Sequence, residues 1–561
     1  MKHMVKRERQ KFITVMDVLV TILFASMYIS NRMHGDSVSW ILFDRLYLLF
    51  TGYFIFRFLL CLNARIFDSM IVFAVQIWAI VEAGKGFMQI IGVLTSNNEL
   101  FVCTGSFNNP GPYGGFLAMA ASVSFASILG YGRDSAGYGY EILYFRIQRF
   151  VSYVCLLLCL ILIPSTQSRA ALVALAACGV LYVCTDGRAR SFAGKYLFVP
   201  VIIIVSVVIL VTVFKRQSAG GRMFISRMNC KTMLDNGLRG VGSGHYPEAY
   251  GKTQIAYFRD RISFADGKLI YEATGKDRLR ADNPNAAFND YLQIGIEYGL
   301  WTMLLFIASF LTALCNMVSI RSPLSSGLVA MLVFALFSYP LSLWQFQVLS
   351  VAFLASGSIR NDCERSTGGL ALTLSMTLIM LLVSLPKAGG MVKRYNAEKQ
   401  WEDERYLFSV GDYGSYEYCC SQLYPEMIHN YPFLYEYAYS QFMNGKLLQS
   451  EENVERAMRL CCNSLLFNLL GDIHKAQGKL DEAERDYMNA FYVLPDRLYP
   501  LSRLARLYYD KGDTVKLQNM VECIRGFRPR VESASTMQIR KQVDELADGI
   551  EWPDDYPLVC E

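Results

Sequence analysis

Arginines in a polar loop are the residues of this chain whose type and spacing best suit a chemical role. Arg222 follows a glycine pair, and Arg227 lies five residues further along a stretch rich in basic residues. Guanidinium groups bind phosphate oxygens through paired hydrogen bonds and keep their charge at physiological pH. Two or three of them together can hold a pyrophosphate and stabilise the charge that it gains as a leaving group. The alternative is that these arginines only solvate the loop or contact lipid headgroups.

A glycine-rich stretch in the same loop, from Gly240 to Tyr246, is a second candidate binding element. It contains Gly242 and His245, and we count both, with Tyr246, among the candidate substrate-binding residues. The Gly-x-Gly-x-Gly spacing is neither a Walker loop nor a dinucleotide fingerprint, because no predicted strand precedes it and no Lys-Ser/Thr follows it. His245 is a candidate base, although a surface histidine is an equally good interpretation.

Two further clusters precede apolar stretches. Asn109 lies in the segment 105–111, where the sequence Asn-Pro-Gly also suits an ordinary turn. Arg169 follows Ser168 at the mouth of an apolar stretch, where a long cationic side chain often only reaches for the membrane surface. The expected orientation of the chain places Arg169 on the outer side of the membrane. Positive charge is disfavoured there in short loops, and this favours a functional role.

The last cluster runs from Asn289 through Asp290 to Glu297. On a helix, Asp290, Gln293 and Glu297 share one face. Acidic groups at the start of a helix also stabilise its positive end without any catalytic role. We take Asp290 and Glu297 as candidate catalytic carboxylates and Asn289 as a candidate contact to substrate. No Asp-x-Asp occurs in the chain, so the sequence predicts neither a divalent-metal site nor a cofactor.

Long apolar stretches must position these clusters. A bilayer core about 30 Å thick needs roughly 20 apolar residues in a helix. The sequence predicts about eleven membrane spans by this criterion, namely 12–30, 40–61, 67–93, 113–132, 147–164, 169–185, 195–214, 291–318, 325–340, 342–357 and 368–386. Basic residues between Lys2 and Lys11 place the N-terminus in the cytoplasm. An odd number of spans then places the C-terminus outside.

The chain divides into two predicted regions. Residues 1–390 form a membrane domain that carries the polar loop 215–290, and residues 391–561 form an extracytoplasmic, charged helical domain. The loop holds thirteen Lys and Arg against eight Asp and Glu, whereas the second region holds 20 against 28. The basic character of the chain therefore reflects membrane topology, and no nucleic-acid partner is predicted. The pairs Cys419-Cys420 and Cys461-Cys462 are either disulfide partners or free thiols.

A repeat of 34 residues organises the second region, because this distance separates Gly478 from Gly512 and Pro495 from Pro529. The small, aromatic and proline positions match a tetratricopeptide-like repeat, whose helix pairs stack into an α-solenoid. We therefore predict an all-α protein, with a polytopic membrane helix bundle and a soluble α-solenoid. The solenoid suits the docking of a protein partner better than catalysis.

Taken in order, the four clusters resemble the O-antigen ligase/polymerase superfamily of bacterial envelope proteins over roughly residues 10–385. The elements that carry the resemblance are Ser168-Arg169 at a span mouth, Gly221-Arg222 before a helix, the Gly240–Tyr246 stretch and the segment 289–299. The appended repeats resemble a known variant of that family. Many members carry a histidine immediately before the asparagine of the last element, and here this position is Phe288.

The resemblance implies a metal-independent, inverting glycosyltransferase in the bacterial inner membrane that acts at the periplasmic face. Its donor would be an undecaprenyl-pyrophosphate-linked glycan, held by Arg169 and Arg222 with help from Arg227. Its acceptor would be lipid A core for a ligase, the growing glycan for a polymerase, or a protein hydroxyl for an O-oligosaccharyltransferase. Asp290, Glu297 and His245 are alternatives for the base that position 288 lacks. A transporter or scaffold that only binds the lipid-linked glycan is the non-enzymatic alternative.

Overall fold

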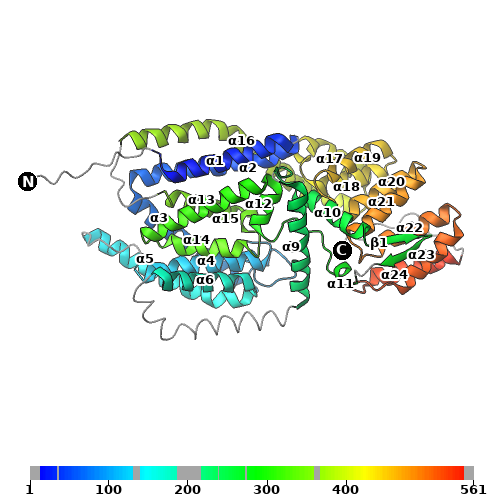
Figure 1. Ribbon diagram of the computed structural model, residues 1–561, viewed down its shortest axis with the longest axis horizontal. Coiled ribbons are helices and arrows are strands. Elements are labelled where there is room, and N and C mark those ends of the chain that lie inside the picture. Colours follow the sequence, from blue (N-terminus) through cyan, green and yellow to red (C-terminus); the bar gives the residue numbers. More distant parts are fainter. Residues whose placement is uncertain are drawn as a thin grey trace, which may run out of the picture.

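The computed structural model describes residues 13–34, 37–130, 139–185, 216–237, 239–271, 275–358 and 367–548. Within these ranges the regular structure is helical apart from one antiparallel hairpin of two short strands. Figure 1 shows long apolar helices gathered in one bundle and the C-terminal helices in a second body beside it. The prediction of an all-α membrane protein is therefore confirmed for the described residues.

The bundle is built from helices of unequal length. They are α1 (Val15–His34), α2 (Ser37–Leu62), α3 (Ala64–Ile90), α4 (Pro110–Ile128), α5 (Gly139–Thr166), α6 (Arg169–Thr185), α13 (Leu300–Ser319), α14 (Leu324–Ala335), α15 (Trp344–Ser356) and α16 (Thr367–Ser409). Among the described residues, α1, α2, α3, α5, α13 and α16 are long and apolar enough to cross a membrane. The predicted span 195–214 and the basic N-terminal segment lie outside the described residues, so the number of spans stays a prediction.

The stretch 291–318 was predicted as one span, but the structure divides it into two helices. α12 (Asp290–Tyr298) ends at Gly299, and α13 begins directly after it. Gly299 has a φ of 90°, a backbone conformation that glycine adopts readily and other residues rarely do. The break separates α12 from the membrane-spanning helix, so the residues at its start can belong to a site outside the bilayer core.

The stretches 325–340 and 342–357, predicted as two full spans, form shorter helices. α14 holds 12 residues and α15 holds 13, joined by the 3-10 turn η1 (Pro340–Ser342). At 1.5 Å per residue, each is about 20 Å long or less, which is shorter than a bilayer core of roughly 30 Å. The two helices therefore enclose a turn, Leu336 to Leu343, that can lie below the membrane surface.

A single helix connects the two bodies. α16 holds 43 residues and runs without interruption through position 390, where the sequence predicts a domain boundary. Asp44 of α2 pairs with both Lys387 and Arg394 of α16, at 3.0 Å in each case. This buried carboxylate ties α16 to the bundle on both sides of the predicted boundary. The connection between the two regions is thus a held helix and not a loose linker.

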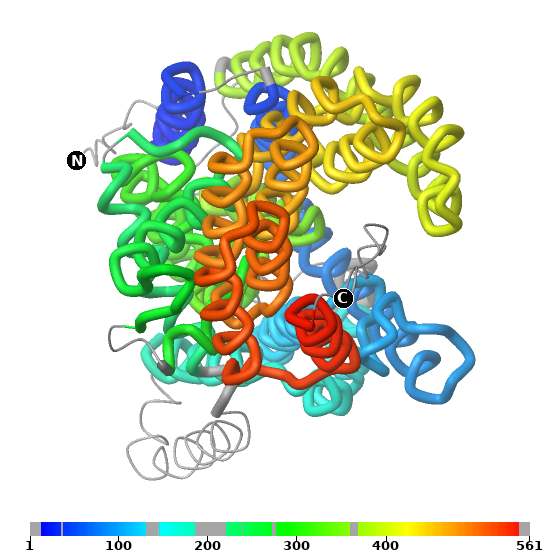
Figure 2. Tube along the Cα trace, turned by 90° about the vertical axis from the view of Figure 1, so that its right-hand side faces the viewer, coloured from blue at the N-terminus to red at the C-terminus, as the bar shows by residue number. Residues whose placement is uncertain are grey.

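The second body is a stack of antiparallel helices. They are α17 (Tyr413–Met427), α18 (Tyr431–Met443), α19 (Leu447–Met458), α20 (Ser464–Ala476), α21 (Leu480–Val493), α22 (Tyr499–Asp510), α23 (Thr514–Gly526) and α24 (Ala534–Ala547). Each contacts its neighbours in sequence, and the alternate helices α18, α20, α22 and α24 also contact one another in series. Four connecting turns contain a glycine with positive φ, at positions 411, 445, 478 and 512. Figure 2 shows the stack as a curved row of helices, from yellow to red. We call this body the helical array.

The polar loop is folded against the helical array. It contains α9 (Arg216–Asn236), α10 (Tyr246–Arg259), β1 (Ile262–Ala265), β2 (Lys268–Tyr271) and α11 (Gly275–Arg278). Buried apolar side chains of the loop, such as Phe258 and Ile262, share one hydrophobic core with those of the array, such as Tyr487 and Leu504. Arg278 donates hydrogen bonds to the carbonyl oxygens of Pro495 and Arg528, at 3.2 and 2.6 Å. The array therefore supports the loop from the side opposite to the bundle.

Replacing Gly251 by alanine tests this shared core. A Cβ atom at Gly251 would lie 2.5 Å from the Cβ and 2.6 Å from the carbonyl oxygen of Cys462, and the second contact is with the backbone of the array. We expect Gly251→Ala to lower the stability of the purified full-length protein by about 1–3 kcal/mol through overcrowding. Thermal unfolding measures this. Gly526→Ala is the control, because nothing lies within 4 Å of a Cβ there. Equal stability of both variants would contradict a loop packed on the array.

Candidate functional site

Three helices, α4, α6 and α12, begin at one end of the bundle, and the starts of α4 and α6 contact each other through Ser168. Asn109 caps α4, because its Oδ1 accepts a hydrogen bond from the Gly111 amide at 2.8 Å. Ser168, which precedes α6, donates from its Oγ to the Gly111 carbonyl oxygen at 3.3 Å. Asn289 caps α12 by accepting from the Leu292 amide at 3.1 Å. Each helix start carries a partial positive charge of roughly half a unit, so this arrangement favours an anion.

Two arginines lie at these helix starts. Arg169 is the first residue of α6, and Arg222 reaches the same place from α9, which Figure 1 shows lying across the end of the bundle next to the helical array. Burial of part of its side chain and the positive charge of Arg169 lower the pKa of Arg222. The two guanidinium groups are therefore close enough to repel each other. A bound anion between them would relieve this repulsion.

Aromatic side chains hold Arg222 in place. Its Cζ lies 5.2 Å from the centre of the Phe288 ring, within the range of a cation–π contact, and its Nη1 donates to the Phe337 carbonyl oxygen at 3.1 Å. The Tyr339 ring packs against Phe288 with the ring centres 5.4 Å apart, and the Tyr339 hydroxyl interacts with the Asn109 side chain. Asn289 Nδ2 donates to the Leu336 carbonyl oxygen at 3.2 Å. The turn between α14 and α15 thus links three of the predicted clusters.

We call this group the arginine site: Asn109, Arg169, Arg222, Phe288, Asn289 and Tyr339. The predicted candidates Asn109, Arg169, Arg222 and Asn289 meet there, although as many as 180 residues separate them in the sequence. Tyr339 was not predicted as a site residue, since it falls within the predicted span 325–340. Two residues that precede helix starts at the site, Gln167 and Phe288, have φ of 50° and 51°. Non-glycine residues rarely adopt this conformation, and such strain is frequent at functional sites.

The two candidate carboxylates are buried within the protein. Asp290 is buried, and its Oδ2 accepts a hydrogen bond from the Leu341 amide at 2.8 Å. Burial, with a smaller contribution from the nearby Glu297, raises the pKa of Asp290 well above its usual value. Burial also raises the pKa of Glu297, against the opposing effect of Arg45, Gln293 and His245. Both groups therefore hold α12 in position, and neither offers an open carboxylate to a substrate.

The glycine-rich stretch lies at the opposite end of α12 from Asn289. The amides of Val241 and Gly242 donate to the carbonyl oxygens of Ile296 and Glu297, both at 2.9 Å, and so satisfy the last turn of that helix. A Cβ on Gly240 would come within 2.5 Å of the Glu297 carbonyl oxygen. These amide groups are therefore used within the protein and are not presented to a phosphate. The stretch fastens the loop to the end of α12.

His245 and Tyr246 belong to the same attachment. His245 is buried between the loop and α2, with its Nδ1 3.1 Å from the Ser39 Oγ and 3.1 Å from the Ser243 carbonyl oxygen. Tyr246 is fully buried and donates to the Oδ1 of Asn229 at 2.8 Å. The structure therefore does not bring Gly242, His245, Tyr246 or Glu297 into the arginine site.

Arg227 also lies outside the arginine site. Its Nη2 pairs with the Asp277 Oδ2 at 2.5 Å, and the same nitrogen donates to the Tyr257 hydroxyl at 3.1 Å. Five residues along α9 turn its side chain well away from that of Arg222. The prediction that Arg227 assists at the phosphate receives no support from this geometry, and its contacts serve the fold of the loop.

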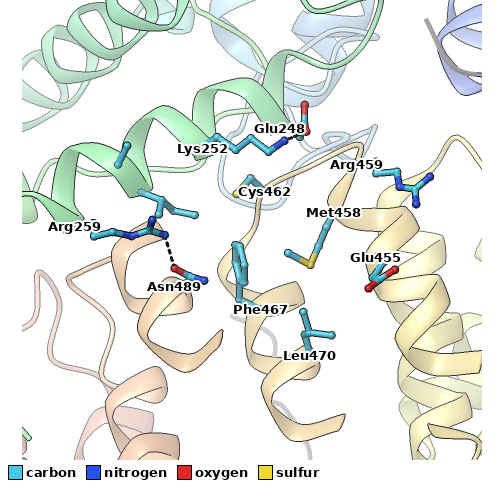
Figure 3. A pocket seen from close by; sticks show the side chains of 12 residues that line it. Glu248, Lys252, Arg259, Glu455, Met458, Arg459, Cys462, Phe467, Leu470 and Asn489 are labelled. Carbon is cyan, nitrogen blue, oxygen red and sulfur yellow. Dashed lines mark hydrogen bonds and ion pairs between the residues drawn. The ribbon is translucent and has the colours of Figure 1, made fainter. Parts of the chain in front are cut away.

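A groove among the described residues lies apart from the arginine site. It has a volume of about 570 Å³ and runs between α10 and the helices α19, α20 and α21 of the array. Figure 3 shows Phe467, Leu470 and Met458 on its inner side, and the ion pair of Lys252 with Glu248 at its rim. Neither arginine of the site lines it. The convergent positive charge of Arg169 and Arg222, and not the volume of a groove, therefore identifies the candidate functional site.

A comparison with protein families finds a match over part of the chain. Residues 154–307 match the family model described as O-antigen ligase. A search of curated proteins finds no match to the chain. The matched segment extends from α5 to α13 and includes Arg169, Arg222 and Asn289, whereas Asn109 and Tyr339 lie outside it. The match supports membership of the O-antigen ligase superfamily, and the spatial convergence adds residues beyond the matched segment.

The buried carboxyl of Asp290 makes a testable contribution to pH dependence. Because its pKa in the folded protein is raised above its unfolded value of about 3.9, the folded protein binds more protons than the unfolded chain over this interval. Stability is therefore highest below the unfolded pKa and falls as the pH rises through the folded pKa. Asp290→Asn should remove this fall while its amide oxygen still accepts from Leu341.

Thermal unfolding of the purified protein measures the effect, at pH values from about 4, near the ordinary pKa of a carboxyl group, to about 8. We expect the variant to gain stability relative to the unsubstituted protein as the pH rises, by about 1.4 kcal/mol for each unit of pKa shift. Asp260→Asn, at an exposed position, controls for the loss of one negative charge. Parallel curves for Asp290→Asn and the unsubstituted protein would show that Asp290 is ionised in the folded state.

Proposed function

We propose that this protein transfers a glycan from an undecaprenyl-pyrophosphate-linked donor to an acceptor hydroxyl at the periplasmic face of the bacterial inner membrane. The match to the O-antigen ligase family supports glycan transfer of this general type. The observation that carries the proposal is the meeting of Arg169, Arg222 and three helix starts at one end of the apolar bundle. In this proposal the N-terminus is cytoplasmic, and the loop and helical array are periplasmic.

The chemistry requires stabilisation of a leaving group. The acceptor oxygen attacks the anomeric carbon while the bond from that carbon to the phosphate oxygen breaks, so the anomeric configuration inverts. The pyrophosphate leaves with the bonding electrons, and Arg169 and Arg222 stabilise its growing charge. Pyrophosphate is a weak base, so the leaving group requires no general acid. The acceptor proton passes to water or to a phosphate oxygen as the new bond forms.

The residue at position 288 bears on which group, if any, acts as the base in this proposal. Where many members of the resembling family carry a histidine, Phe288 supplies a ring that packs against Arg222 and Tyr339. A phenyl ring accepts no proton, and Asp290 and Glu297 are buried away from the arginines. We therefore propose that positioning and leaving-group stabilisation provide most of the rate, with no side chain of the arginine site acting as the base.

The helical array is the region that we propose to be a tetratricopeptide-like solenoid. Its four turn glycines at intervals of 33 or 34 residues and its serial packing of alternate helices support this class. Because it is attached to the loop that carries Arg222, a protein docked on the array would lie near the arginine site. This arrangement favours a protein, as acceptor or as partner that delivers the acceptor, as the ligand of the array.

Substitution of the arginines tests the proposed function. In a deletion strain complemented with each variant, Arg169→Ala and Arg222→Ala should abolish the glycan product, with a loss of rate of about 10²–10³ for each lost donor. Arg222→Lys should retain part of the activity, because it keeps the charge but not the paired hydrogen bonds. Arg227→Ala is the matched control on the same helix, because its partners are Asp277 and Tyr257.

Gels of envelope polysaccharide and of periplasmic glycoproteins identify the acceptor. A polysaccharide ladder that is lost or shortened without the protein indicates ligation or polymerisation, and a loss of glycan from proteins indicates O-oligosaccharyl transfer. Full activity of both Arg169→Ala and Arg222→Ala, expressed at the normal level, would exclude the proposed mechanism. Intact ladders and glycoproteins in the deletion strain would favour the scaffold or transporter alternative.

A further inference from the structure

The loop between α3 and α4 presents its apolar side chains outward. Leu100 is 84% exposed, and Ile91 and Val102 are each 69% exposed. Other large apolar residues of the segment are also exposed, namely Ile90, Val93, Leu94 and Phe101. Glu99 is the single Asp, Glu, Lys or Arg between Lys85 and Arg133 in the sequence. Figure 2 shows this blue segment as a loop at the edge of the molecule.

Hydrogen bonds to α3 hold the part of the chain that follows these exposed residues. Gln89 accepts hydrogen bonds from the amides of Thr104 and Gly105 at 2.9 and 2.8 Å, and donates to the Gly105 carbonyl oxygen at 2.9 Å. Glu82 accepts from the Ser106 amide at 2.9 Å and from its hydroxyl at 2.7 Å. The exposed apolar side chains are therefore carried by an ordered loop. Residues 104–106, which follow them in the chain, are hydrogen-bonded to α3.

The outward face of the loop continues a face of α3. Residues of α3 that are exposed and apolar recur at helical spacing along one side, namely Ile66, Met70, Ile77, Val81 and Met88. In a helix long and apolar enough to cross the membrane, such a stripe faces lipid. Ile91, directly after the helix, continues the stripe, and the loop adds the remaining residues. One apolar surface thus runs from the bilayer-facing side of α3 to the tip of the loop.

We propose that residues 91–102, here called the apolar loop, insert into the boundary between headgroups and acyl chains of the leaflet next to the arginine site. The occupant of this surface is membrane lipid. A segment with outward apolar side chains and almost no charge suits this depth, because the neighbouring headgroup region still supplies hydrogen-bond partners to its exposed polar and backbone groups. This inference does not depend on the proposed function.

Insertion of the apolar loop has a consequence for the arginine site. Asn98 Nδ2 donates to the Asn108 carbonyl oxygen at 3.2 Å. The next residue, Asn109, caps α4, and its side chain interacts with Tyr339. The chain from the lipid surface to the site is therefore short and hydrogen-bonded. The apolar loop holds the site at a fixed height relative to the lipid headgroups, where the phosphates of any lipid-linked ligand lie.

Photo-crosslinking from the loop tip tests the insertion. A benzophenone amino acid replaces Leu100 in the full-length protein, which is reconstituted in nanodiscs of phosphatidylethanolamine and phosphatidylglycerol and irradiated. Intact mass then shows whether a lipid is attached. The control carries the same group in place of Val515 of the helical array, which is 60% exposed. We expect lipid adducts at position 100 and none above background at position 515.

A second pair of variants separates insertion from folding. With the benzophenone at Phe101, the double substitution Leu100→Asp and Val102→Asp should abolish the lipid adducts, because two carboxylates oppose entry into the acyl region. Thermal stability should change little, since the inward hydrogen bonds of Gln89 and Glu82 are untouched. Absence of lipid adducts from the benzophenone at position 100, in a loop with no other substitution, overturns the proposal. Crosslinks to another protein in native membranes, without lipid adducts, also overturn it and assign the surface to that protein.

Discussion

The structure depends on holding two like charges together. Arg169 begins α6 and Arg222 lies on α9, and their mutual repulsion opposes the arrangement. Three helix starts add further positive potential at the same place. Folding must supply the energy that keeps these groups in one site before any anion arrives. Preorganised positive charge of this kind is effective in catalysis because no reorganisation is needed when negative charge develops.

The surrounding architecture supplies that support from several directions. α6 is fixed at its start by Ser168 and the Gly111 carbonyl oxygen, within the apolar bundle. α9 packs against α10 and α12, and its buried residues Phe224, Ile225 and Met228 join the core that the loop shares with the helical array. α12 is fixed at one end by Asn289 and at the other by the glycine-rich stretch. The array is thus part of the frame that positions Arg222, whatever else it binds.

Much of the arginine site could be predicted from the sequence because its signals are local. Asn109 and Asn289 are helix caps, and Arg169 and Arg222 lie where charge is unexpected or follows flexible glycines. The same reasoning did not separate these residues from Gly242, His245 and Glu297. Glycines permit a phosphate to approach the backbone, but they equally permit one segment of backbone to approach another. The sequence alone does not show which of these a given stretch provides, because the partner is distant in the chain.

Long-range packing also determines the features that the periodicity of the sequence did not predict. Hydropathy treats the stretch 291–318 as one apolar segment, since it does not detect that Gly299 adopts a φ of 90° and redirects the helix. Tyr339 carries no motif, and its role follows only from contacts with Asn109 and Phe288.

Position 288 shows how this packing bears on mechanism. A residue held at a φ of 51° directly before a helix cap is constrained by its surroundings, so its side chain direction is set before its chemistry matters. A histidine in that orientation would lie against Arg222, where an adjacent positive charge disfavours its protonated form. A phenyl ring in the same place offers the guanidinium an aromatic face, and it has no group that can bind a proton. Compared with the histidine of the family that the chain resembles, Phe288 therefore offers no base but keeps an aromatic contact with Arg222. A site whose leaving group is already weakly basic can work without that base, and a site that relied on proton abstraction at this position could not.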